Sequence, residues 1–130
     1  MNTIRFSIVG AAIAALALAG PASAQEGKIT FGGALCLTGD QAALDTPGYR
    51  GAQVAIKAIN DAGGLLGRQV EFINIDGKSD PVTVGNAAVQ LIDQGADLIL
   101  APCDFDFGGP ASREAQSAGL AQRLFRHRAK

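Results

Sequence analysis

Several features that would point to a particular class of protein are scarce in this sequence. Among 130 residues there are two cysteines and one histidine, and the formal net charge is −1. Two cysteines are too few for a small disulfide-framed protein, and at positions 36 and 103 they lie too far apart for a structural zinc finger. A net charge so close to zero excludes a general basic footprint for nucleic acid. The length allows one domain at most, which would bury roughly 60–70% of the surface of its unfolded chain.

The first of three segments with different compositions is residues 1–24. It carries one charge, Arg5, followed by small and apolar residues from Phe6 to Gly20 and then by Pro21-Ala22-Ser23-Ala24. This order is typical of a secretory signal peptide, so we expect export and cleavage after Ala24. A membrane anchor is the alternative, but the stretch is short for about 30 Å of hydrocarbon. A lipid anchor is not supported, because no cysteine lies at or just after the boundary.

The other two segments differ in charge. Residues 25–120 hold six basic and twelve acidic side chains, whereas residues 121–130 hold four basic side chains, no acidic ones and the histidine. The last segment is interpreted as a solvated basic tail, as an amphipathic helix on anionic lipid, or as a segment foreign to the fold. Its arginines would make a buried central strand costly. We therefore expect no further strand there, and we hypothesise a truncated chain whose last ten residues are read from a shifted frame.

Strand-like and helix-like segments alternate in residues 25–120. Strands are expected at Lys28–Leu35, Val70–Asp76 and Asp97–Ala101, which are rich in β-branched and other apolar residues. The last of these is almost entirely apolar, as expected for a strand that is covered on both faces of a parallel sheet.

Three helices are expected, because a proline stands where each helix would begin and a glycine where it would end. The prolines are Pro47, Pro81 and Pro110, and the glycines are Gly63, Gly95 and Gly119. Thr46 and Asp80 precede the first two prolines as capping residues. The expected apolar faces are Ala52, Ala55, Ile56 and Ile59 in the first helix and Val84, Ala88, Leu91 and Ile92 in the second.

This alternation predicts an α/β fold, with a partial parallel sheet and flanking helices in the order βαβαβα. Ligands of such sheets bind beyond the carboxyl ends of the strands, which makes Cys36–Pro47, Asp76–Pro81 and Pro102–Pro110 the loops of interest. The turns at the opposite edge, Gly63–Gln69 and Gly95–Ala96, are expected to be structural.

Five motifs occur in order between about Lys28 and Leu120, and the most specific stretch among them runs from Ile59 to Arg68. The motifs read Leu37-Thr38-Gly39-Asp40, Gly51-Ala52-Gln53, Ala58-Ile59-Asn60-Asp61-Ala62-Gly63-Gly64-Leu65-Leu66-Gly67-Arg68, Asp76-Gly77-Lys78-Ser79-Asp80-Pro81 and Ala101-Pro102-Cys103. Together they resemble the amino-terminal lobe of periplasmic solute-binding proteins of the branched-chain amino-acid type. The resemblance implies the first part of one lobe of a two-lobed receptor in the periplasm. It also implies a branched-chain or related amino acid as ligand and an ABC permease as partner, with contact to the membrane only through that transporter. Enzymatic activity, a cofactor and a metal are not expected.

The resemblance further implies where the ligand would lie. Thr38, Gly39 and Leu44 would border it from the first loop, and Cys103, Asp104 and Phe105 would border it from the third. This sequence departs from the family pattern of small hydroxyl residues in the third loop. There Asp104 would stand near the ligand carboxylate, and two anions repel each other in a poorly solvated cleft. Either Asp104 turns outward, the ligand presents a cation, or the alignment slips by one residue, with Phe105 as an apolar wall.

The two cysteines follow the first and third expected strands. If the strand order is 2-1-3, Cys36 and Cys103 are neighbours, and a disulfide and two free thiols both remain open. A catalytic cysteine is not expected, because the only histidine lies in residues 121–130. Arg68 is interpreted as a surface residue, and the pair Asp80-Pro81 as a helix cap rather than a ligand site.

Two other functions remain as alternatives. A periplasmic sensor for a small amino acid or amide would use the same lobe. A flavodoxin-like or receiver-like enzyme domain would use Asp76 at a strand end, but the signal segment argues against a cytoplasmic location. Dinucleotide binding is not expected, because Gly32, Gly33 and Gly39 lack the required spacing. Since the family uses two lobes, we expect the 130-residue chain to bind amino acids poorly and, with apolar surface left uncovered, to be poorly soluble.

Overall fold

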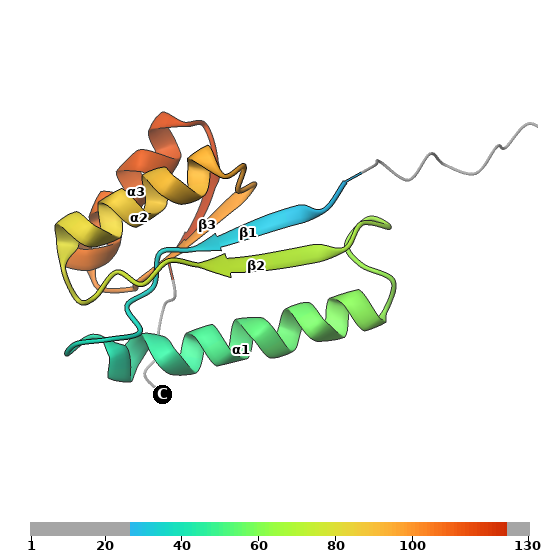
Figure 1. Ribbon diagram of the computed structural model, residues 1–130, viewed down its shortest axis with the longest axis horizontal. Helices are drawn as coiled ribbons and strands as arrows, with labels where there is room; N and C mark the ends of the chain where they lie inside the picture. The colour runs from blue at the N-terminus through green and yellow to red at the C-terminus, as the bar shows by residue number, and fades with distance from the viewer. Residues whose placement is uncertain (1–26, 125–130) are drawn as a thin grey trace, which may run out of the picture.

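The computed structural model describes residues 27–124, and the side chains of residues 27–120 (Figure 1). The predicted signal peptide, residues 1–24, lies outside this range, as do residues 125–130 of the basic tail. The elements are β1 (Ile29–Gly33), α1 (Ala42–Asp61), β2 (Val70–Asn74), α2 (Pro81–Asp93), β3 (Leu98–Ala101), α3 (Phe105–Ser117) and β4 (Ala121–Leu124). The strands form one parallel sheet in the order β2-β1-β3-β4, which confirms the predicted α/β class and the order 2-1-3.

The helices cover the two faces of the sheet unequally (Figure 1). α2 and α3 pack side by side on one face, over a core that includes Val84, Leu91 and Ile99. α1 lies alone on the other face, where Ile56 packs with Ile29 and Val70. The predicted apolar face of α2 is confirmed as buried or partly buried. That of α1 is confirmed only in part, because Ala55 is exposed on a helix that contacts mainly one edge of the sheet.

The strand β4 corrects one prediction. Residues 121–130 were not expected to contain a strand, yet Ala121–Leu124 pairs in parallel with β3, from Leu98↔Ala121 to Ala101↔Leu124. Desolvation of the arginines would be costly in a central strand, which is enclosed on both sides. In the described part of the chain β4 is an edge strand, which hydrogen-bonds only to β3 and therefore need not be enclosed on both sides. The shifted reading frame of residues 121–130 stays a prediction.

The helix starts agree with the sequence at one of three places. α2 begins at Pro81 as predicted, with the Asp80 carboxylate accepting a hydrogen bond from Thr83 N at 2.7 Å. α1 and α3 begin before Pro47 and Pro110, which lie inside these helices, so the cap at Thr46 was wrong. A side-chain cap supports the earlier start of α3, whereas Gln41, the residue before α1, makes no side-chain cap bond. In α3 the Asp104 carboxylate accepts from Asp106 N at 2.9 Å, and a proline in the second turn removes only one intrahelical bond.

The helix ends agree with the sequence at all three places. Gly63, Gly95 and Gly119 have φ values of 104°, 84° and 70°. After α2, Gly95 N donates to Ile92 O and the next amide, Ala96 N, donates to Leu91 O. This pair of hydrogen bonds ends a helix at a residue in the left-handed conformation, which glycine adopts without a steric cost. None of the helices in residues 27–124 is long and apolar enough to cross a membrane.

Candidate functional site

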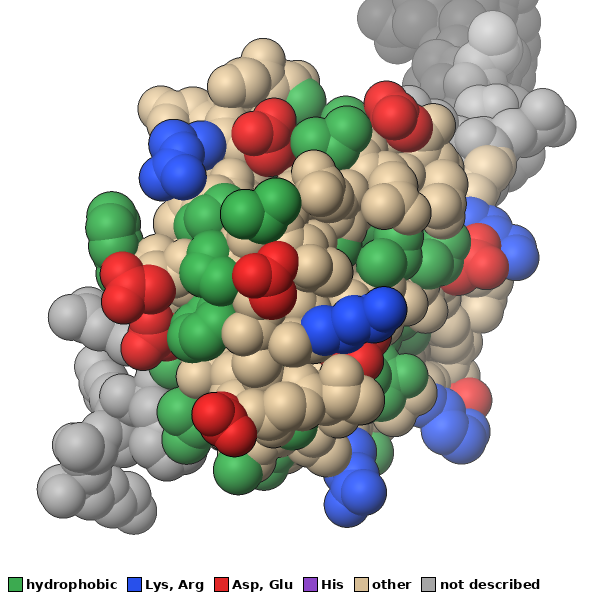
Figure 2. Space-filling model, turned by 60° about the vertical axis from the view of Figure 1, so that its left-hand side comes forward, with side chains coloured by type: hydrophobic (Ala, Val, Ile, Leu, Met, Phe, Trp, Pro, Cys, Tyr) green, Lys and Arg blue, Asp and Glu red, His purple; other side chains and the backbone are tan. Residues whose placement is uncertain are grey.

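We define the carboxyl edge of the sheet as the loops 34–41, 75–80 and 102–104, which follow β1, β2 and β3. The strands β1 and β2 point toward this end of the molecule (Figure 1). Figure 2 turns this end toward the viewer and shows acidic and hydrophobic side chains interspersed over it. The six residues that the sequence singled out for ligand contact all lie on these loops or on the first turns of α1 and α3.

Asp76 connects the loop after β2 to the loop after β1. Its Oδ1 accepts hydrogen bonds from Leu37 N at 2.8 Å and from Lys78 N at 2.9 Å, and its Oδ2 accepts one from Thr38 Oγ1 at 2.7 Å. Partial burial works to raise the pKa of Asp76, but the hydrogen bonds from Lys78, Thr38 and Leu37 outweigh it and lower that pKa. Asp76 is therefore a charged acceptor that orders its surroundings.

Ser79 forms the second connection between the same two loops. Its hydroxyl donates to Thr38 O at 2.8 Å and accepts from Gln41 N at 2.9 Å. Gly39, with φ 83°, lies so close to Ser79 that a Cβ at position 39 would meet the Ser79 side chain. Thr38 and Gly39, which the sequence placed at the rim, are thus exposed residues of a loop whose backbone is tied down on both sides.

Asp45 is a buried acid that the sequence did not single out. It lies in the first turn of α1, is only 4% exposed, and its Oδ2 accepts a hydrogen bond from Cys36 N at 2.8 Å. Burial raises the pKa of Asp45, and the charge of Asp104 adds to this effect. The sequence held no signal for Asp45, because Pro47 had suggested a later helix start.

The apolar candidates Leu44 and Phe105 are 63% and 78% exposed at the starts of α1 and α3. Cys103 and Asp104 are exposed as well. In the structure the Asp104 carboxylate turns back onto its own helix and accepts a hydrogen bond from Asp106 N. It thereby occupies a backbone N–H at the amino terminus of α3, near the place that the resemblance implies for the ligand carboxylate.

The two cysteines are free thiols in this structure, so the alternative of a disulfide is not realised. Cys36 is buried, and Cys103 is exposed. Burial raises the pKa of the Cys36 thiol, which makes it less reactive. Within residues 27–124, no group of three or more histidine, cysteine or acidic residues is arranged to hold a metal ion.

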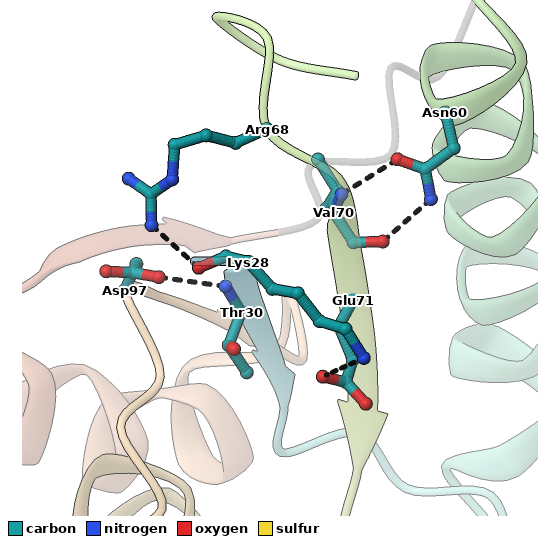
Figure 3. Close-up of polar contacts among 7 residues, drawn as sticks. All are labelled: Lys28, Thr30, Asn60, Arg68, Val70, Glu71 and Asp97. Carbon is teal, nitrogen blue, oxygen red and sulfur yellow. Dashed lines mark hydrogen bonds and ion pairs between the residues drawn. The ribbon is translucent and has the colours of Figure 1, made fainter. Parts of the chain in front are cut away.

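The opposite, amino edge comprises the turns 62–69 and 94–97 and residues 27–28 (Figure 3). The Asn60 side chain donates to Val70 O at 2.8 Å and accepts from Val70 N at 2.7 Å. Asp97 accepts from Thr30 N at 2.8 Å. Arg68, expected at the surface, is half-buried and donates to Gly27 O and Lys28 O at 3.1 and 2.7 Å, because its guanidinium replaces strand partners at the start of β1. These bonds support the expectation that this edge is structural.

The comparison with protein families matches residues 28–120 to a family described as periplasmic binding protein. The Leu/Ile/Val-binding protein homolog 3 of Brucella melitensis is 34% identical over 88 residues, which cover 68% of this chain and 24% of that protein. The Leu/Ile/Val-binding protein homolog 4 of Brucella abortus is 28% identical over 119 residues, which cover 91% of this chain and 28% of that protein.

Solved structures with a similar fold belong to the same kind of protein. The branched-chain amino acid transporter substrate-binding protein LivJ of Streptococcus pneumoniae, in complex with isoleucine, superposes with a TM-score of 0.72 at 28% identity. The match covers 75% of this chain and 28% of LivJ. The leucine-binding protein LivK of Thermotoga maritima has a TM-score of 0.66 at 21% identity, over 74% of this chain and 27% of LivK. The chain thus spans about a quarter of the length of these relatives.

Proposed function

Because this chain belongs to the periplasmic binding protein family, we propose that its carboxyl edge forms one wall of the ligand cleft of an amino-acid receptor for an ABC importer. The observation that carries the proposal is the ordered, ligand-accessible pair of loops at this edge, on a fold that matches the isoleucine-bound LivJ. Branched-chain or related amino acids are the proposed ligands, and the cognate ABC permease is the proposed partner.

The exposed residues of this wall suit an aliphatic ligand. Leu44 and Phe105 present apolar surface that the described residues do not cover. A wall on one side buries little of a small ligand, whereas binding sites enclose most of the ligand surface. Residues 27–120 therefore need a second wall, such as the remaining three quarters of the relatives would supply.

A chimera tests this proposal directly. Residues 28–120 replace the matching segment of the S. pneumoniae LivJ, and calorimetry measures binding of isoleucine, leucine and valine. We expect the chimera to bind at least one of these ligands, and the 130-residue chain alone to bind none at sub-millimolar concentration. A folded chimera that binds no aliphatic amino acid would contradict the function, and sub-millimolar binding by the chain alone would contradict the need for a second wall.

Asp104 offers a matched pair of variants within that chimera. Asp104→Asn removes the charge but keeps a good helix cap, whereas Asp104→Ala removes both. If a ligand carboxylate approaches α3, Asp104→Asn should bind isoleucine more tightly, by up to about tenfold, with the gain largest at low salt. A weaker affinity in Asp104→Asn would instead indicate that Asp104 binds the ligand ammonium.

We also propose export to the periplasm with cleavage after Ala24. The support is the composition of residues 1–24 together with the family. Amino-terminal sequencing of the exported protein should begin at Gln25. A protein that retains Met1 would contradict cleavage.

A further inference from the structure

We propose that Asp76 and Ser79 are positioning residues, which hold the segment Thr38–Gln41 in its ligand-facing conformation before any ligand arrives. The segment matters because Thr38, Gly39 and, one turn later, Leu44 border the proposed cleft, so the inference rests on the proposed function. The side chains of Asp76 and Ser79 make four hydrogen bonds to the first loop, and these satisfy groups on both sides of Gly39. They are Leu37 N to Asp76 Oδ1, Thr38 Oγ1 to Asp76 Oδ2, Ser79 Oγ to Thr38 O, and Gln41 N to Ser79 Oγ.

The loop after β2, residues 75–80, adopts a backbone conformation that makes these hydrogen bonds possible. Lys78 and Ser79 both have φ 53°, a left-handed conformation that costs energy for residues with a side chain. The start of α2 does not require the bonds to the first loop, because Asp80 caps that helix through Thr83 N and Thr83 Oγ1. The strained pair instead places the Ser79 hydroxyl between Thr38 O and Gln41 N.

The hydroxyl protons of Ser79 and Thr38 are both donated within the protein, which distinguishes a positioning role from direct donation to a ligand. The Ser79 hydroxyl has one proton, which it donates to Thr38 O, so it has none to donate to a ligand carboxylate. The Thr38 hydroxyl likewise donates its proton to Asp76. Thr38 therefore faces the cleft as an acceptor, suited to an ammonium or amide N–H of the ligand.

Amide hydrogen exchange on the full 130-residue chain, followed by NMR, tests the proposal without any ligand. Ser79→Ala removes the hydroxyl, and Ser79→Gly removes it while also relieving the left-handed strain. In both variants the Gln41 amide should exchange at least about tenfold faster, while the Ala34 amide, bonded to Leu100 O in the sheet, changes little. The Gly variant keeps the test informative if the Ala variant does not fold.

Asp80→Asn is the control, because it alters a capping acid in the same loop that has no bond to residues 38–41. It should leave the ratio of Gln41 to Ala34 exchange unchanged. Unchanged Gln41 exchange in both Ser79 variants, or an equal acceleration of Gln41 and Ala34, would overturn the proposal. Since these rates need no ligand, this failure is distinguishable from a chimera that does not bind.

Discussion

The two edges of the sheet use side chains for different purposes. At the amino edge, Asn60, Arg68 and Asp97 hydrogen-bond to strand backbone, so that each polar side chain replaces a missing partner in the sheet. At the carboxyl edge, Asp76 and Ser79 hydrogen-bond to a neighbouring loop and leave apolar side chains exposed beside it. The most specific family motif, Ile59–Arg68, lies at the amino end, far along the strands from the proposed ligand wall. We therefore interpret this motif as a requirement of folding rather than of ligand binding.

The largest effect is expected at Gly64, and it sharpens the assignment of the amino edge to folding. Gly64 has φ 87°, and a Cβ there would overlap the carbonyl oxygen of Arg68. Gly64→Ala should lower the free energy of unfolding by about 3 kcal/mol or more, which urea denaturation measures. Gly63→Ala is the control, because Gly63 also has a positive φ but open space around it, and it should cost only about 1–2 kcal/mol. Equal costs would show that the close approach to Arg68 is unimportant.

Asn60 should give the next largest effect. Asn60→Ala removes both hydrogen bonds to Val70 and leaves two strand groups without a protein partner, so we expect a loss of about 2 kcal/mol by urea denaturation. Asp61→Ala, next to it, breaks only an exposed ion pair with Lys57 and should change stability by less than about 0.5 kcal/mol. In the LivJ chimera a variant at Asn60 should leave the isoleucine affinity of the folded protein unchanged. A large loss of isoleucine affinity would contradict the assignment of the amino edge to folding and the carboxyl edge to ligand binding.

Two carboxylates at the carboxyl edge, Asp45 and Asp76, should contribute to stability with opposite dependences on pH. Because burial and Asp104 raise the pKa of Asp45 above its ordinary value near 3.8, its stabilising contribution is complete below that value and is lost as the pH rises through the raised pKa. For Asp76, whose pKa is lowered, the contribution is present above the ordinary value and is lost as the pH falls through the lowered pKa.

Asparagine variants separate these two carboxylates. Asp45→Asn keeps an oxygen for Cys36 N, so its urea midpoint relative to the unsubstituted protein should rise between pH 4 and pH 7. The deficit of Asp76→Asn should be largest at neutral pH and shrink below about pH 4. Urea midpoints at several pH values between 3 and 7 measure both. Parallel curves for the two variants would contradict the opposite directions of the pKa changes.

The smallest effects on stability are expected at the exposed apolar residues. Leu44→Ala and Phe105→Ala remove side chains that are 63% and 78% exposed, so each should change the free energy of unfolding by less than about 0.5 kcal/mol. In the chimera the same changes should weaken isoleucine binding, because these side chains border the proposed ligand. Val54→Ala, on the outer face of α1 and 71% exposed, is the control and should change neither quantity. A cost in stability without a change in binding would contradict a ligand-facing role.

Much of the fold was predictable because it depends on local chemistry. Glycine after each helix and Asp80-Pro81 before α2 are conformational preferences of single residues, and the structure confirms them. The starts of α1 and α3 were missed because Pro47 and Pro110 were assigned to the first helical position, whereas both prolines lie in the second turn of their helices. The strand β4 was missed because residues 121–130 as a whole have a basic composition, which suggests a surface segment, and only the pairing with β3 makes Ala121–Leu124 a strand.

The candidate site was predictable to the same limited extent. Parallel strands place their carboxyl ends at one edge, so the sequence alone indicates which loops to examine. It does not indicate that Asp76 bonds to Leu37, or that Asp45 lies buried under the first loop, because these contacts join residues distant in sequence or on different elements.

The order of elements from β1 to α3 follows from the sequence by itself, since periodicity and the preferences of proline and glycine act over a few neighbouring residues. Only the tertiary structure decided the directions in which the pKa values of Asp45 and Asp76 change, and that both cysteines are free. It also decided that the Thr38 hydroxyl donates its proton to Asp76. The physical reason is that burial and hydrogen bonding exist only once separate loops meet, and no local pattern of residues encodes the distance between them.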